Sequence, residues 1–200
     1  KEAIETYTDA ELKRLLKKPD IRKCGFVTYR SWVIVNFLLS TGIRQNSLIN
    51  IKIKDLDFDN DMVYINTTKN RKSLIIPLNE DIVKILHEYL KYRGGGSEDW
   101  LFCSIYGEKM TKGANYTALW DYSHSRRLDK TGVHRYRHTF AKKWVTMGGS
   151  IVTLQKILGH SSLAITEGYL NMLTTDLKKD MNEINIIRSL KQERMQIVRH

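Results

Sequence analysis

Hydrophobic positions in the first part of the chain follow helical spacing. Thr8 and Glu11 have the spacing of a capping box, which predicts a helix from Thr8 to about Lys18. The mostly apolar run Phe26–Ser40 predicts a second helix that is buried on several sides. This helix should end before Gly42, because glycine favours the left-handed conformation that closes many helices.

Two short β-branched or aromatic runs, Met62–Ile65 and Leu74–Ile76, interrupt this pattern and predict strands. The polar connection Asn66–Ser73 between them predicts a β-hairpin. Its tip is basic and contains Lys69, Arg71 and Lys72. Trp100–Phe102 is expected to add a third short strand, so the sequence predicts one small antiparallel sheet.

The rest of the chain returns to helical spacing, with glycines between the segments. Further helices are predicted at Gln45–Ile49, Glu80–Arg93, Asn115–Leu128, His134–Met147, Ile151–Leu158, Ala164–Leu170 and Thr175–Val198. The last one carries a long apolar stripe, so this terminal helix packs either on its own core or on a neighbouring protomer. The predicted fold is mainly α with a small antiparallel β-sheet (α+β), in a single domain of residues 1–200.

The charge of the chain indicates a kind of binding partner. The chain has 200 residues, and its 33 Lys and Arg against 22 Asp and Glu give a net charge of +11. Between Asp121 and His160, eight basic residues face only two acidic ones. Such an excess indicates a polyanionic partner, with nucleic acid favoured over an acidic membrane surface. No apolar run approaches the roughly 20 residues that a membrane span needs.

The two cysteines, Cys24 and Cys103, are far apart and lack metal-site spacing. We interpret them as free thiols of a protein from a reducing, intracellular compartment.

The candidate functional residues are most concentrated in the segment His134-Arg135-Tyr136-Arg137-His138. On a helix, His134, Arg137 and His138 share one face. The two histidines could hold a metal, but Arg137 would place a cation beside it, so we predict no metal and no other cofactor. The alternative is a phosphate clamp, with a planar guanidinium fork and imidazole donors. Arg44, at a turn between two predicted helices, is either a surface arginine or a second phosphate ligand.

Taken together, these blocks resemble the tyrosine recombinase (integrase) family. The matching blocks are Thr41-Gly42-Ile43-Arg44, a hairpin lysine, His134-x-x-Arg137-His138, Leu158-Gly159-His160 and Tyr169. They occur in the family's order and spacing, and the resemblance runs from about Thr8 to about Leu190. Within the family, the pattern is most similar to integrases of phages and conjugative transposons.

The resemblance implies a role for each matching residue. Arg44 and Arg137 would grip the non-bridging oxygens of one phosphate, His134 would aid phosphate binding and proton transfer, His160 would donate a hydrogen bond to the phosphate, Lys69 would protonate the leaving 5′ oxygen, and Tyr169 would be the nucleophile. Lys72 is an alternative to Lys69. Ser47 stands where the family often has an acidic residue.

The resemblance also implies the reaction and its setting. The chain would cut and rejoin double-stranded DNA through a 3′-phosphotyrosyl link, without metal or ATP. It would assemble as a tetramer on DNA in the cytoplasm of a bacterial or phage-infected cell, with accessory DNA-bending or directionality proteins. The family's N-terminal DNA-binding domain is expected to be absent from this chain. Two other functions stay open: a nicking-closing topoisomerase, and a basic DNA-binding protein without catalysis.

Overall fold

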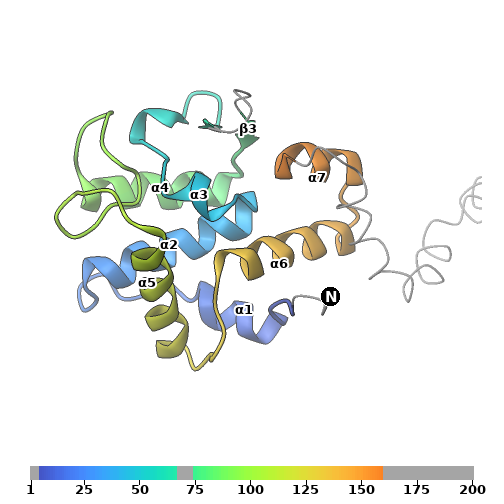
Figure 1. Cartoon of the computed structure of the whole chain (residues 1–200), viewed down its shortest axis with the longest axis horizontal. Coiled ribbons are helices and arrows are strands. Elements are labelled where there is room, and N and C mark those ends of the chain that lie inside the picture. The colour runs from blue at the N-terminus through green and yellow to red at the C-terminus, as the bar shows by residue number, and fades with distance from the viewer. Residues whose placement is uncertain (1–4, 67–73, 160–200) are drawn as a thin grey trace, which may run out of the picture.

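The structure is a computed structural model that describes residues 5–66 and 74–159. Within these residues, helices surround one long central helix, and a small sheet lies at one side (Figure 1). The helices are α1 (Asp9–Leu16), α2 (Phe26–Thr41), α3 (Gln45–Leu48), η1 (Ile53–Asp55), α4 (Glu80–Arg93), α5 (Lys112–Ser125), α6 (Val133–Thr146) and α7 (Ile151–Leu158). The strands are β1 (Leu56–Asp57), β2 (Met62–Ile65) and β3 (Leu74–Pro77). The mainly α fold with a small antiparallel sheet is confirmed.

The central helix is α2, which contacts α1, α4, α5 and α6. A helix that is apolar on most sides is stable only when neighbours cover it on most sides, as they do here. Val33, Ile34 and Phe37 are fully buried. The helix closes at Gly42, whose φ of 60° is the left-handed conformation that the sequence predicts for this position.

The sheet has the order β1-β2-β3, and both strand pairs are antiparallel. The predicted pairing of β2 with β3 is confirmed, with Val63 opposite Ile76. The predicted strand at Trp100–Phe102 is wrong. Trp100 forms one isolated bridge with Lys52, and its neighbours bond irregularly to the segment around η1. The third strand is β1, and its two residues are too few to give a hydrophobic pattern.

Helix α5 begins three residues earlier than predicted. Its cap is Thr111, whose hydroxyl accepts from the Ala114 amide at 3.1 Å. Lys112 and Gly113 follow this cap, and glycine in a first turn hides the start of a helix from a propensity argument. Helix α5 also ends earlier, at Ser125, and Arg127 adopts a φ of 59°. The predicted helices Ala164–Leu170 and Thr175–Val198 lie outside the described residues.

Buried hydrophobic side chains form two clusters. The large one surrounds α2 and draws on segments from Tyr7 to Tyr136. The small one consists of Phe140 and Ala141 of α6 with Leu154 and Leu158 of α7. Helix α7 contacts α6 and β3, and its buried residues belong to the small cluster. Arg137 and His138 stand in the sequence between Tyr136 of the large cluster and Phe140 of the small one.

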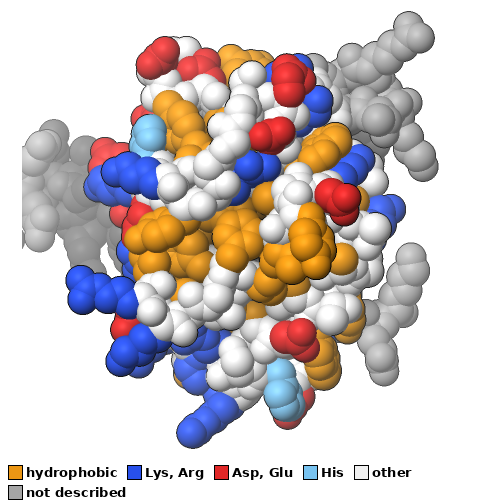
Figure 2. Space-filling view, turned by 90° about the vertical axis from the view of Figure 1, so that its left-hand side faces the viewer, with side chains coloured by type: hydrophobic (Ala, Val, Ile, Leu, Met, Phe, Trp, Pro, Cys, Tyr) orange, Lys and Arg blue, Asp and Glu red, His pale blue; other side chains and the backbone are white. Residues whose placement is uncertain are grey.

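The face on the left of Figure 1 is turned away from α7. Figure 2 views this face and shows hydrophobic side chains at its centre, with lysines and arginines along one margin. No helix within residues 5–66 and 74–159 is both long and apolar enough to cross a lipid bilayer.

Candidate active site

Helix α6 carries the segment that the sequence analysis singled out. It starts after Gly132 and places His134, Arg137 and His138 within its first two turns. His134 is exposed, His138 is half-buried and Arg137 is buried with 6% of its surface exposed. The predicted shared face is therefore present, but its arginine points into the protein.

Arg137 joins the ends of two other helices. Its Nη1 donates to the carbonyl of Gly42 at 2.7 Å, and its Nη2 donates to the carbonyl of Leu158 at 2.9 Å. Both carbonyls lie at helix C-termini, where main-chain acceptors lack helical partners and the helix dipole favours a cation. The planar guanidinium fork suits two such acceptors. Arg137 thus fixes the residues that precede Arg44 and His160 in the sequence.

Arg44 reaches the same place from α3. It occupies the position before this helix and is exposed. A Cβ atom on Gly159 would lie 3.9 Å from Arg44 Nη1, which places the Arg44 guanidinium beside the C-terminal cap of α7. Arg44 and Arg137, which are far apart in the sequence, therefore meet at the C-terminal end of α7. Two cations held at one place are suited to binding an oxyanion.

The close packing here requires the motif glycine at 42. A Cβ on this residue would lie 2.4 Å from Phe140 Cδ1 and 2.9 Å from Leu158 Cδ2. Its φ of 60° adds a second constraint, because side chains other than glycine are strained in this conformation. Gly42 thus lets α2 end directly against the small hydrophobic cluster.

The electrostatics of α6 favour a neutral imidazole at its second histidine. Burial, followed by the positive influence of His134 and Arg137, lowers the pKa of His138 below the usual 6.5. Metal binding at the two histidines would need further ligands. Among the described residues, no group of three His, Cys, Asp or Glu side chains is placed to hold a metal ion.

Three of the six predicted site residues, Arg44, His134 and Arg137, lie in the part of the chain that the structure describes. The structure brings Arg44 and Arg137 together, and it puts His134 one turn before Arg137 on α6. Lys69, His160 and Tyr169 lie outside the described residues, as do the alternative Lys72 and Arg71. Gly159, directly before His160, is the C-terminal cap of α7.

The basic surplus between Asp121 and His160 is only partly available to a polyanion. Lys130 pairs with Glu5 and Glu11, Arg135 pairs with Glu5, and Lys143 pairs with Asp9. Arg137 is buried. Three of the eight basic residues counted in this stretch, Lys130, Arg135 and Lys143, therefore pair with acidic residues from the start of the chain.

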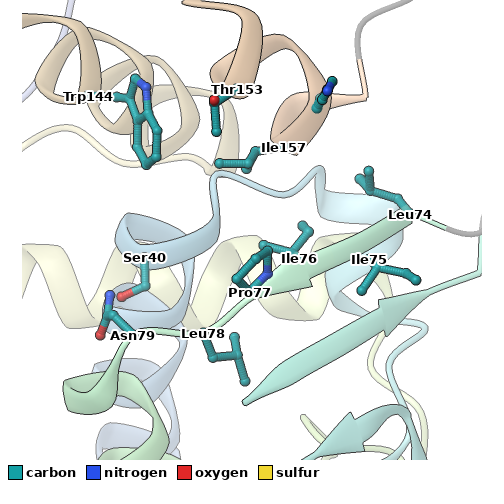
Figure 3. A pocket seen from close by; sticks show the side chains of 11 residues that line it. Ser40, Leu74, Ile75, Ile76, Pro77, Leu78, Asn79, Trp144, Thr153 and Ile157 are labelled. Carbon is teal, nitrogen blue, oxygen red and sulfur yellow. The ribbon is translucent and has the colours of Figure 1, made fainter. Parts of the chain in front are cut away.

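A cavity of about 540 Å³ lies beside the site, between β3, the end of α2, α6 and α7 (Figure 3). Its walls are mostly apolar, with Ile76, Trp144 and Ile157 facing inward, and among the described residues Lys156 is the one charged residue in its lining. Neither Arg44 nor Arg137 lines it. The cavity is therefore separate from the place where the two arginines meet.

Comparison with known proteins identifies the family. Residues 5–176 match the model of the phage integrase family. The chain belongs to this family. It is 33% identical over 153 residues to tyrosine recombinase XerA of Saccharolobus solfataricus, covering 74% of this chain and 48% of the relative. It is 28% identical to XerA of Pyrococcus furiosus, covering 93% of this chain and 64% of that one. This integrase-family chain thus spans about half to two thirds of the length of these curated relatives.

Solved structures agree on the fold. A crystal structure of XerA recombinase matches with a TM-score of 0.77 and 28% identity, covering 92% of this chain and 65% of that one. The Tn1549 transposon integrase in complex with a circular intermediate DNA matches with a TM-score of 0.70 at 24% identity, covering 84% of this chain and 62% of that one. The predicted catalytic-domain fold of the tyrosine recombinases is confirmed.

Proposed function

We propose that this chain is the catalytic part of a site-specific DNA recombinase, which cuts and rejoins DNA through a covalent link between Tyr169 and a 3′ phosphate. The observation that carries the proposal is the meeting of Arg44 and Arg137 at the C-terminal end of α7, next to Gly159. Its support from the comparisons is the match to relatives named tyrosine recombinases.

The proposed reaction is an in-line phosphoryl transfer. The Tyr169 hydroxyl gives up its proton to a base, which in this proposal is His134, and its oxygen attacks the phosphorus of the scissile phosphate. The bond to the 5′ oxygen breaks, and that oxygen takes a proton from Lys69, or from the alternative Lys72. A tyrosine hydroxyl has a pKa of about 10, so it is a weak nucleophile near neutral pH. Fixed cations around the phosphate stabilise the charge that develops on its oxygens, and they favour the phenolate.

In this proposal, an exposed arginine and a buried arginine have different roles at the phosphate. Exposed Arg44 is the phosphate ligand in this proposal, and exposed His134 assists it. Buried Arg137 supplies a fixed positive charge and holds the ends of α2 and α7. Direct contact of Arg137 with phosphate stays a prediction, as does the hydrogen bond from His160. The phosphotyrosyl link conserves the energy of the broken bond, so the proposed rejoining needs neither ATP nor a metal ion.

The proposal extends to the assembly. We expect a tetramer on double-stranded DNA, in which the predicted helix Thr175–Val198 packs in cis or on a neighbouring protomer. Such a reaction involves two DNA duplexes, and a symmetric oligomer is the usual way to hold several identical sites together.

A trapping assay tests the nucleophile. The protein, its Tyr169→Phe variant and a Tyr116→Phe control are each mixed with a pool of nicked duplexes of randomised sequence in EDTA, then run on a denaturing gel. Tyr116 is an exposed tyrosine of α5 and serves as a matched control. We expect a covalent protein–DNA band from the native protein and from Tyr116→Phe only. A band of undiminished strength from Tyr169→Phe would show that another residue is the nucleophile.

Together with a plasmid relaxation assay, the trapping assay separates the two other functions. Relaxation of supercoiled plasmids of any sequence, together with a Tyr169-dependent band, would favour a nicking-closing topoisomerase. Binding to DNA with no covalent band under any condition would favour a DNA-binding protein without catalysis. Salt dependence of binding does not separate them, because each function neutralises phosphates.

A further inference from the structure

The segment Glu5–Glu11, here called the N-terminal clasp, lies along α6 (Figure 1). Tyr7 is its centre and is buried, with 3% of its surface exposed. The Tyr7 ring lies 4.8 Å from the ring of Tyr136, and the Tyr7 amide donates to Thr139 Oγ1 at 3.1 Å. Its hydroxyl donates to the carbonyl of Lys130 at 3.3 Å. The clasp is thus joined to α6 and to the residues just before it.

Ion pairs surround this aromatic contact. Glu5 lies 3.1 Å from Lys130 and 3.2 Å from Arg135, and Arg135 also donates to the main-chain carbonyl of Glu5. Glu11 lies 2.9 Å from Lys130, and Asp9 pairs with Lys143. Every acidic residue of the clasp therefore pairs with a basic residue of the segment that contains α6.

The contacts fall on one side of the helix. Residues in an α-helix turn by about 100° each, so Arg135, Thr139 and Lys143 form one stripe. By the same count, Arg137 and His134 lie roughly 160° and 140° from the centre of this stripe, and His138 lies at its flank, roughly 100° away. The clasp therefore contacts one side of α6, and His134 and Arg137 lie on the other.

These contacts affect the orientation of α6 more than they affect the overall stability of the protein. Exposed ion pairs contribute only about 0 to 1 kcal/mol each to folding. A rotation of α6 about its axis, however, would move Arg137 away from the carbonyls of Gly42 and Leu158. A set of directional contacts on the outer side of the helix opposes such a rotation.

We propose that Glu5, Tyr7 and Asp9 are positioning residues: the N-terminal clasp sets the rotation of α6, which keeps Arg137 on the carbonyls of Gly42 and Leu158 and His134 at the candidate phosphate site. The role rests on the proposed function, since it matters only when α6 contributes to the site. It assigns the start of the described chain to the reaction centre rather than to folding alone.

A charge exchange between Asp9 and Lys143 tests the clasp. This pair involves one acid and one base, so it can be reversed and then restored. Asp9→Lys sets two cations against each other, and Asp9→Lys combined with Lys143→Asp rebuilds the pair with its charges exchanged. Asp59→Lys, at an exposed turn distant in sequence from α6, changes the net charge by the same amount and is the control.

The first readout is the single-turnover rate of covalent adduct formation on the nicked pool. We expect Asp9→Lys to lower this rate about fivefold, or roughly 1 kcal/mol, with DNA affinity equal to that of Asp59→Lys. The exchanged pair should return to within about twofold of the native rate. An unchanged rate in Asp9→Lys, or no recovery in the exchanged pair, would overturn the proposal.

The second readout does not need activity. The imidazole resonances of His134 and His138, measured by NMR, report the surroundings of the motif side of α6. Asp9→Lys should shift them, the exchanged pair should restore them, and Asp59→Lys should leave them in place. If the native protein forms no adduct, the recombinase proposal fails, and the clasp is then decided by these resonances alone. Unshifted resonances in Asp9→Lys would refute it.

Discussion

Helices α2 and α7 both approach the candidate site, but they are held in different ways. Helix α2 lies inside a hydrophobic cluster that draws on segments from Tyr7 to Tyr136. Helix α7 contributes two residues to a small cluster of four buried residues, and its last carbonyl accepts a hydrogen bond from Arg137. Local stability follows the amount of buried apolar contact, so α7 should open more readily than α2. The site is thus built where a firmly held region meets a weakly held one.

Removing a side chain from the α2 cluster gives the largest expected effect. Phe37 is fully buried, and its ring lies 5.5 Å from that of Phe102. Phe37→Ala should lower the free energy of unfolding by about 4 kcal/mol, because it leaves a large cavity. Urea unfolding followed by circular dichroism measures this. Val27→Ala, at a partly exposed position of the same helix, is the control. Equal losses in both variants would contradict the description of α2 as the stabilising centre.

Removing a side chain from the α7 cluster should act locally. Leu154 is fully buried. Leu154→Ala should cost about 3 kcal/mol, mostly as easier opening of α7. Hydrogen exchange read by mass spectrometry should show α7 amides losing protection while α2 amides keep theirs. Val152→Ala, at an exposed position of α7, should change neither. Loss of protection in α2 as well would mean that the two clusters unfold as one unit.

The junction between the two regions can be tested at the glycines that end α2 and α7. Gly42 and Gly159 both have a φ of 60°, so alanine is strained equally at each. They differ in space, since a Cβ would meet Phe140 at 2.4 Å from position 42 but only a Leu74 methyl at 3.4 Å from position 159. Gly42→Ala should therefore cost about 2 kcal/mol more than Gly159→Ala in unfolding experiments. Equal costs would mean that Phe140 and Leu158 move aside freely.

The sequence predicted the firmly held region better than the junction. The apolar run of α2 and the capping box at Thr8 are local signals, and the structure confirms them. The strand expected at Trp100 failed because its partner was a distant segment, not a neighbour in sequence. The same limit applies at the site. The spacing of the motifs indicated which residues belong together, but not that Arg137 would be buried on carbonyls 95 and 21 residues away.

The N-terminal clasp was missed for a related reason. Glu5, Asp9 and Glu11 are spread over a segment whose only local signal was the capping box of α1. Their partners lie more than a hundred residues away in the sequence. Charge counted within a window of sequence therefore includes several basic residues that the chain pairs with its own acidic residues.

The smallest expected effect concerns protonation at the junction. Burial and the neighbouring His134 and Arg137 lower the pKa of His138 below 6.5 in the folded protein. In the unfolded chain the same imidazole titrates near its usual value, so below about pH 6.5 the unfolded state binds more protons than the folded state. Linkage then requires that this residue lowers stability as the pH falls through 6.5, and that the loss levels off below the folded pKa.

His138→Gln removes this contribution and should flatten the pH dependence of stability. Urea unfolding of both proteins between about pH 7.5 and about pH 5 measures the difference, since carboxylate titrations are common to both. The expected gap grows toward acid in favour of the variant, and it should be smaller than the effects of Leu154→Ala and Gly42→Ala. Parallel curves would mean that the surroundings of His138 admit a proton as readily as water does. If the variant instead loses more stability in acid than the native protein, the sign of the His138 contribution is reversed. The fold would then stabilise the His138 imidazolium, which would mean that the surroundings of the half-buried face of α6 are anionic rather than cationic.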